Sequence, residues 1–171
     1  EDITPDCLNP YSVSKVAAEN VCKMYSDLFD LNTVSLRYFN VYGDRQPLVG
    51  QYAPVVGLFL EQWKKGEAFT IVGDGEQRRD FTHVDDVVKA NIAAAERASD
   101  ISGELINVGT GTNYSVNQIA DMICNQYTKN FIPPRPAEAR VTLADISKAK
   151  KLLGYMPSIE ISDWIDEYKV Q

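Results

Sequence analysis

A tyrosine and a lysine stand four residues apart near the start of the chain, in the segment PYSVSK that begins at Pro10. The residues around them predict a helix, and side chains four residues apart on a helix lie on the same face. An ammonium beside a phenol stabilises the phenolate. Tyr11, with Lys15 as its neighbour, could therefore exchange a proton near neutral pH, as alcohol–ketone redox chemistry requires. Because Tyr-x-x-x-Lys also arises by chance in amphipathic helices, the pair alone does not establish a catalytic site.

The composition is that of an ordinary soluble globular protein. The 171 residues suffice for about one domain, and 44% of them are hydrophobic and 24% charged. The net charge of −7 argues against non-specific nucleic-acid binding, for which a basic surface is the usual footprint. No apolar run approaches the roughly 18 residues of a membrane span, so we expect neither nucleic acid nor membrane as a partner.

The sequence predicts no metal site. Its cysteines, Cys7, Cys22 and Cys124, lack the spacing of metal ligands, and the single histidine, His83, excludes a zinc site built on histidines. An odd number of cysteines without a visible cleavable leader predicts reduced thiols and a cytoplasmic location. The chain starts at Glu1 in what reads like the middle of a loop, so we expect it to be part of a larger protein.

Helical and extended patterns alternate along the chain, which implies parallel strands in an α/β fold. The predicted helices cover 10–29, 54–65, 84–98 and 116–127, with a short helix from Asp145 to Gly154 and a last one capped by Ser162. The predicted strands cover 33–39, 68–72, 80–82 and 105–108, with loops at 40–50 and 131–139. These strands are few for an open parallel sheet, so the chain reads as the second half of a larger fold.

Three further segments carry polar residues in positions that suit a ligand. The first is RYFNVYG from Arg37, in which Asn40 follows a predicted strand, and parallel sheets bind ligands at the carboxyl ends of their strands. The second is GDGEQRRDF from Gly73, in which two arginines follow a turn. The third is RPAEAR from Arg135, followed closely by LADISKA from Leu143.

With Tyr-x-x-x-Lys, these segments resemble the extended short-chain dehydrogenase/reductase superfamily, specifically its NAD-dependent nucleotide-sugar epimerase/dehydratase branch. The motifs follow the family's order almost from end to end, although Ala137 stands where many relatives have glycine. The resemblance implies the C-terminal part of a Rossmann-like parallel sheet, formed by 1–45 and 84–110. It also implies a small α/β substrate-binding subdomain, formed mainly by 46–83 and 111–171. The N-terminal dinucleotide-binding half, with its G-x-x-G-x-x-G fingerprint, is absent from the sequence.

The resemblance also assigns roles around the NAD cofactor. Tyr11 would be the catalytic acid/base that takes a proton from a sugar hydroxyl as hydride moves to the nicotinamide. Lys15 would favour the phenolate and bind the nicotinamide ribose, and Tyr38 would also contact the cofactor. The acidic residue that binds the cofactor ribose in the family is missing with the N-terminal half.

Four residues are implied in substrate binding. Asn40 matches the family residue that contacts the diphosphate or the sugar, and the stretch containing Val72 would pass the nucleobase. Arg79 and Arg140 match arginines that contact phosphate, for which a planar guanidinium is well suited because it binds two oxygens at once. Arg78 is expected to form only a surface ion pair.

The resemblance implies an NAD-dependent 4-epimerase of the UDP-glucose/UDP-galactose type, acting through a transient 4-keto sugar. Relatives that convert dTDP-glucose by 4,6-dehydration or decarboxylate UDP-glucuronate share the same motifs, so the substrate would be a UDP- or dTDP-sugar. As an epimerase fragment the chain is expected to be inactive alone. A non-catalytic module that keeps the nucleotide-sugar contacts but has lost catalysis is the third interpretation. By analogy with the family, a homodimer is expected.

Overall fold

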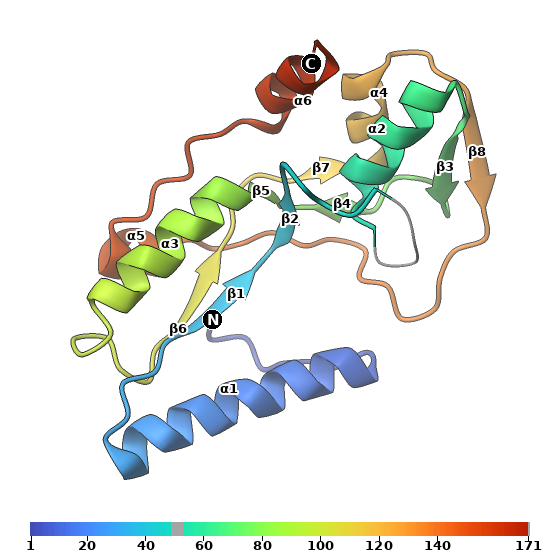
Figure 1. Ribbon diagram of the computed structural model, residues 1–171. Coiled ribbons are helices and arrows are strands. Elements are labelled where there is room, and N and C mark those ends of the chain that lie inside the picture. Colours follow the sequence, from blue (N-terminus) through green and yellow to red (C-terminus); the bar gives the residue numbers. More distant parts are fainter. Residues whose placement is uncertain (49–52, 171) are drawn as a thin grey trace.

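The computed structural model describes residues 1–48 and 53–170, which form an α/β arrangement (Figure 1). The helices are α1 (Pro10–Phe29), α2 (Val55–Lys65), α3 (Val84–Glu96), α4 (Val116–Ile123), α5 (Ser147–Leu153) and α6 (Ile161–Lys169). The strands are β1 (Ser35–Tyr38), β2 (Asn40–Tyr42), β3 (Phe69–Val72), β4 (Arg78–Arg79), β5 (Phe81–His83), β6 (Leu105–Val108), β7 (Tyr114–Ser115) and β8 (Lys129–Ile132). Among the described residues, no helix has the length and apolar character needed to cross a membrane.

The strands pair mainly in parallel, as the alternation of helices and strands predicted. β1 pairs with β6, β2 with β5, and β3 with β8, all in parallel, whereas the short β4 and β7 are antiparallel. In the β1–β6 pair the register runs from Ser35 opposite Leu105 to Tyr38 opposite Val108. Parallel pairing places the carboxyl ends of both strands at the same edge, which is the edge from which β2 continues (Figure 1).

Helices cover both faces of the β1–β6 pair. α1 lies along one face, where Arg37 of β1 donates two hydrogen bonds to the Glu19 carboxylate, while α3 and α5 lie on the other (Figure 1). Apolar side chains from α3, β6 and α5 form a buried cluster that includes Ala90, Ile106 and Ala149. α5 therefore packs with the β1–β6 layer although it comes late in the chain.

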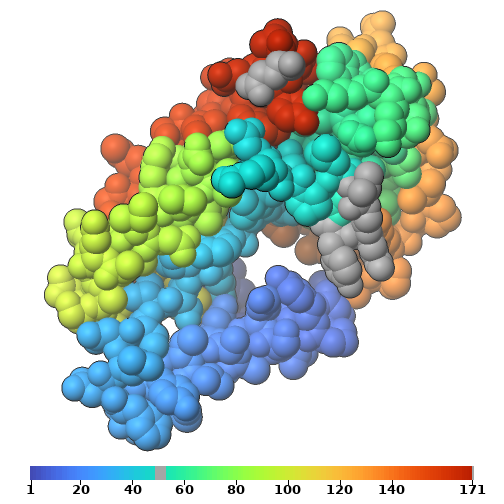
Figure 2. Space-filling model, viewed as in Figure 1, coloured from blue at the N-terminus to red at the C-terminus, as the bar shows by residue number. Residues whose placement is uncertain are grey.

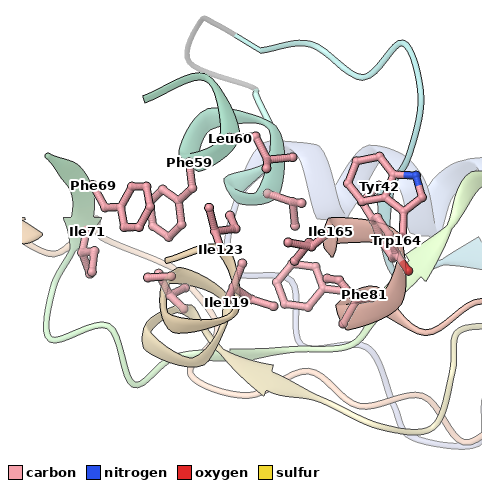
Figure 3. Close-up of a cluster of buried hydrophobic side chains, with 14 residues drawn as sticks. Tyr42, Phe59, Leu60, Phe69, Ile71, Phe81, Ile119, Ile123, Trp164 and Ile165 are labelled. Atoms are coloured by element: carbon pink, nitrogen blue, oxygen red, sulfur yellow. The ribbon is translucent and has the colours of Figure 1, made fainter. Parts of the chain in front are cut away.

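A second buried cluster holds together β3, α2, α4 and α6 (Figure 3). At one end the Phe59 ring stacks on the Phe69 ring, with centroids 4.8 Å apart. At the other end the rings of Tyr42 and Trp164 meet edge to face, with centroids 5.3 Å apart. Aromatic pairs in these geometries add to the stabilisation from burial. The cluster therefore stabilises the part of the fold from which the segments GDGEQRRDF and RPAEAR extend.

Two fully buried carboxylates join segments that are distant in sequence. Asp80 accepts hydrogen bonds from Thr110, Gly111 and Ala144. Asp86, at the start of α3, accepts them from Lys89, Ser158 and Ile159. Because a buried carboxylate is costly unless it is hydrogen-bonded, each of these networks strongly favours one arrangement of the chain around it.

Several predicted boundaries were wrong. The predicted helix over 116–127 ends at Ile123, and the predicted loop over 131–139 begins inside a strand, because β8 finds its partner in the distant β3. The predicted loop over 40–50 begins as β2, and its last two residues lie outside the described part of the chain. The last helix begins at Ile161 after Glu160, rather than after Ser162.

Candidate functional site

The first turn of α1 is fixed by a reciprocal cap. The Asn9 side chain accepts a hydrogen bond from the Ser12 N–H at 2.9 Å, the Ser12 hydroxyl oxygen accepts one from the Asn9 N–H at 3.2 Å, and Pro10 occupies the first helical position. Such caps satisfy backbone donors that the helix leaves free. The cap therefore fixes the backbone from which the Tyr11 and Lys15 side chains extend.

Tyr11 and Lys15 lie together on the surface. The Lys15 Nζ lies 5.2 Å from the centre of the Tyr11 ring, which confirms that the two side chains share one face of the helix. Tyr11 is 69% exposed, so its hydroxyl is open to a ligand approaching α1. In the space-filling view an open hollow separates the first turns of α1 from the body of the molecule (Figure 2).

Tyr38 is the last residue of β1, and Asn40 is the first residue of β2. The Tyr38 hydroxyl donates to the Asn91 Oδ1 of α3 at 2.8 Å, so this side chain lies on the face of the sheet opposite α1. The neighbouring Arg37 contacts α1 instead, as expected where successive side chains of a strand alternate. The structure thus does not bring Tyr38 together with Tyr11. Asn40 is exposed, and its N–H donates to the Asp80 carbonyl at 2.9 Å.

The two arginines of β4 have different surroundings. Arg79, whose side chain is only 11% exposed, donates to the Glu138 carboxylate and to the Arg78 carbonyl, both at 2.9 Å. Arg78 donates to the side chain and the carbonyl of Asn113, at 2.8 and 2.7 Å. Arg78 thus binds a neutral partner instead of the expected ion-pair partner and holds the loop before β7, whereas Arg79 faces an acidic group that an anionic ligand could replace.

A cavity of about 650 Å³ lies beside the carboxyl ends of β3 and β8. Two of the four predicted substrate residues, Val72 and Arg140, line it, and so does Glu138, the partner of Arg79. One wall is apolar and the other is charged. The remaining lining residues are Gly73, Asp74, Gln77, Phe131, Ile132, Pro133, Pro134, Arg135 and Ala139.

Ion pairs occupy Asp74, Glu138 and Arg140 on the charged wall of the cavity. Arg140 donates two hydrogen bonds to the Asp74 carboxylate, at 2.7 and 2.9 Å. The Arg140 guanidinium, helped by the Glu76 N–H, lowers the pKa of Asp74 to about 2, so the pair is charged across the physiological range. Because both side chains are well exposed, the pair contributes little to stability, and it leaves Arg140 available to a stronger anionic partner.

Sequence reasoning missed several lining residues. Gln77 donates its side-chain amide to the Val72 carbonyl at 2.9 Å and thereby fixes the end of β3. Arg135 belongs to a motif already singled out, but nothing in the sequence alone showed that it would face the same cavity as Val72. The pairing of β3 with β8 is what places Phe131 and Arg135 there.

Five of the seven predicted site residues fall into two groups, and Tyr38 and Asn40 belong to neither. Val72 and Arg140 line the cavity at β3 and β8, and Arg79 reaches its edge through Glu138. Tyr11 and Lys15 lie on α1, outside this cavity. An apolar wall for a planar base and guanidinium groups for phosphate suit a nucleotide, while an exposed phenol beside an ammonium suits proton transfer.

Several known proteins are similar to this chain. Residues 1–109 match the NAD dependent epimerase/dehydratase family. The UDP-glucose 4-epimerase of Mycolicibacterium smegmatis is 35% identical over 96% of the chain and 53% of its own length. A UDP-N-acetyl-alpha-D-glucosaminuronate decarboxylase of Bacillus cytotoxicus is 37% identical over 92% of the chain and 51% of its own length.

Among solved structures, the UDP-glucuronic acid 4-epimerase of Bacillus cereus, in complex with UDP-glucuronic acid and NAD, is similar with a TM-score of 0.86. It is 38% identical, and the match covers 97% of the chain and 53% of that protein. The chain thus spans about half the length of these relatives. With the family's motifs present in order and its fold reproduced, the chain belongs to the NAD dependent epimerase/dehydratase family.

Proposed function

We propose that the chain is the C-terminal part of an NAD-dependent nucleotide-sugar epimerase, of the UDP-glucose/UDP-galactose 4-epimerase type. The observation that carries the proposal is the Tyr11–Lys15 pair, with the ammonium 5.2 Å from the phenol ring, in a family member that also has an arginine-bearing cavity. Its epimerase relatives support the reaction type. The division into a Rossmann-type part and a substrate-binding part is included in this proposal.

At the catalytic pair, Tyr11 Oη takes the proton of a sugar hydroxyl and later returns it. Lys15 supports this exchange, because its positive charge stabilises the phenolate that forms. Their phenol and ammonium also fit the ribose and nicotinamide end of NAD, whereas the sequence has no glycine-rich fingerprint for the pyrophosphate. NAD, when bound, supplies reversible hydride transfer, which allows passage through a 4-keto sugar. Tyr38 is assigned to the cofactor only through family resemblance.

At the cavity, the chain's residues hold the nucleotide. The backbone around Val72 and the apolar wall with Phe131 accommodate the base, and Arg79 and Arg140 bind the diphosphate. Asn40 contacts the diphosphate or the sugar between these two regions. The arginine–carboxylate pairs are charge-assisted like the guanidinium–phosphate bonds that would replace them. The exchange of carboxylate for ligand therefore also draws on contacts of the base with the apolar wall.

Exchange of Tyr11 for phenylalanine tests the proposal, in a full-length enzyme that contains this chain. Loss of the hydroxyl removes the proton acceptor, and turnover should fall by at least about 100-fold with little change in substrate binding. Tyr25→Phe is the matched control, because Tyr25 is also a partly exposed tyrosine of α1. The turnover of each variant is measured with UDP-glucose as substrate. Unchanged turnover in Tyr11→Phe would remove Tyr11 from the mechanism.

Other reactions of the family are the second candidate. The 37% identical decarboxylase favours a decarboxylation of a UDP-uronate, and a dTDP-glucose 4,6-dehydratase would use the same Tyr–Lys pair. Product analysis after incubation with each sugar distinguishes these reactions from epimerisation. A non-catalytic nucleotide-sugar-binding module is the third candidate, and it predicts that the chain binds UDP but not NAD in calorimetry.

We include a homodimer and a cytoplasmic setting in the proposal. The dimer is supported by a stripe of apolar side chains along the exposed side of α1, consisting of Val13, Ala17, Val21, Met24 and Leu28. Exposed apolar stripes of this kind often mark contacts between proteins. The three free cysteines support a reducing compartment.

A further inference from the structure

The Asp80 carboxylate joins three parts of the chain. Its Oδ1 accepts hydrogen bonds from the N–H and the hydroxyl of Thr110, both at 2.8 Å, and its Oδ2 accepts from the N–H groups of Gly111 and Ala144, at 3.0 and 3.2 Å. The side chain is fully buried. It therefore ties the link between β4 and β5 to the turn after β6 and to the segment before α5.

The turn after β6 packs tightly against Asp80. A Cβ built on Gly109 would lie 2.4 Å from the Ala144 side chain and 2.9 Å from Asp80 Oδ2. The turn after β6 therefore approaches the carboxylate as closely as a glycine allows. The position of Asp80 is thus set by contacts on more than one side.

The main chain of Asp80 lies between two predicted substrate residues. Its carbonyl accepts the hydrogen bond from the Asn40 N–H at 2.9 Å, and Arg79 is its neighbour in sequence. β5, which begins at the next residue, pairs with β2 in a register that places Phe81 opposite Asn40. Any shift of Asp80 would consequently move Asn40 and Arg79 relative to each other.

We propose that Asp80 is a positioning residue for the nucleotide diphosphate, acting through Arg79 and Asn40. The inference rests on the proposed function of Arg79, and it adds a residue that touches no ligand itself. The buried carboxylate holds the backbone from which the Arg79 side chain extends to Glu138 at the edge of the cavity. It does so through four donors, three of them rigid backbone N–H groups.

Replacement by asparagine removes this function while preserving size. An amide has one acceptor oxygen and one NH2 group. In either orientation of the Asp80→Asn side chain, the NH2 group faces two of the four donors and cannot accept their hydrogen bonds. Two of the four hydrogen bonds are lost and donors are placed against donors. We expect the turn after β6 to move away and the backbone at Arg79 to follow.

Asp86 provides a matched control. It is also fully buried and accepts four hydrogen bonds, from Lys89 Nζ at 2.9 Å, the Ser158 N–H at 2.9 Å, the Ser158 hydroxyl at 3.1 Å and the Ile159 N–H at 3.2 Å. None of these partners lines the cavity at β3 and β8. Asp86→Asn therefore reproduces the structural damage without touching the proposed positioning.

Calorimetric titration of the chain with UDP, together with thermal unfolding of each variant, tests the inference. Both Asp80→Asn and Asp86→Asn should lower the unfolding midpoint, but only Asp80→Asn should weaken UDP binding, by about tenfold. In an Arg79→Gln background, Asp80→Asn should change the affinity less than about twofold, because effects that act through one residue are not additive. If Asp80→Asn does not fold, Thr110→Val, which removes one of the four bonds, should show the same pattern to a smaller degree.

Undiminished UDP affinity in folded Asp80→Asn, or equal weakening by Asp86→Asn, would overturn the inference and leave the proposed function intact. If the unsubstituted chain does not bind UDP, the proposed role of the cavity fails. In that case a crystal structure of Asp80→Asn decides the matter. A displaced Arg79–Glu138 ion pair supports the positioning, and an undisturbed pair refutes it.

Discussion

Ala137 holds a backbone conformation that a residue with a Cβ adopts only at a cost. Its φ is +57°, in the left-handed region, which costs a non-glycine residue roughly 1–2 kcal/mol. The resemblance to the family had marked this position, since many relatives have glycine there. The residue lies in the loop that carries the charged wall of the cavity, between Arg135 and Arg140.

Ala137→Gly should therefore stabilise the chain slightly. Relief of the strain exceeds the entropic cost of glycine, which is about 0.5–1 kcal/mol, so we expect a gain of up to about 1 kcal/mol. Ala139→Gly, in the same segment but without a positive φ, should instead lose about 0.5–1 kcal/mol. Urea unfolding of both variants checks this, and a loss in both would show that Ala137 is not strained.

The two arginines proposed to bind diphosphate should differ in their contributions. Arg79 is largely buried, so Arg79→Gln should weaken UDP binding by about 1–3 kcal/mol, the scale of a lost hydrogen bond to a charged group. Arg140 is exposed, and its loss should weaken UDP binding less than the loss of Arg79 does. Arg97→Gln, which alters an arginine bound to the Leu152 carbonyl, is the control. Calorimetric titration with UDP measures the affinity of each of the three variants. If Arg79→Gln binds UDP as tightly as the unsubstituted chain, Arg79 serves only in its ion pair.

At the scale of elements, local patterns predicted most helices and the parallel pairing. β8 was missed because a four-residue strand beside three prolines has no local signal, and its hydrogen bonds come from the distant β3. The cavity at the end of those two strands was therefore invisible in the sequence, although Val72, Arg79 and Arg140 had been selected one by one. Tyr38 was placed with the cofactor from a motif, but only the pairing of β1 with its neighbours shows which face its side chain occupies.

The orientation of α1 against the sheet is the feature that the sequence predicted least well. The apolar steps predicted an amphipathic helix, yet the side turned to the sheet includes Ser12, Glu19 and Ser26, while the apolar stripe faces outward. Glu19 is retained on the inner side because it binds Arg37. A periodic pattern shows that a helix has an apolar face, but it does not show which part of the molecule or which partner that face contacts.

Disruption of that stripe tests the proposed dimer. Val21→Glu places a charge in the middle of the stripe and should convert a dimer of the chain into a monomer, because an unpaired buried charge is unfavourable at an apolar contact. Val88→Glu, which alters a comparably exposed valine on α3, should leave the mass unchanged. Light scattering after gel filtration measures both. A monomeric unsubstituted chain would contradict the dimer.

At the scale of the whole molecule, stability in acid should depend on Asp86. Burial raises the pKa of this carboxyl, but hydrogen bonds from Ser158, Lys89 and Ile159 outweigh burial, so its pKa lies below the usual value. Its stabilising contribution is complete above the pKa of the carboxyl in the unfolded chain, about 3.9. The contribution is lost as the pH falls through the lower pKa of the folded chain. Unfolding midpoints between about pH 2 and pH 6 should fall on acidification, and less steeply in Asp86→Asn. Equal slopes would contradict this role.

The ion pairs at the cavity have a consequence for which anions the molecule accepts. Asp74 and Glu138 are tethered beside the guanidinium groups they bind, so they act as built-in competitors at a high effective concentration. We expect a small free anion such as inorganic phosphate to gain too little to displace these carboxylates. A larger guest that also covers the apolar surface around Phe131 and Pro134 would gain more. Under the proposed function we therefore expect the cavity to prefer compounds that join negative charge to a flat ring over bare salts.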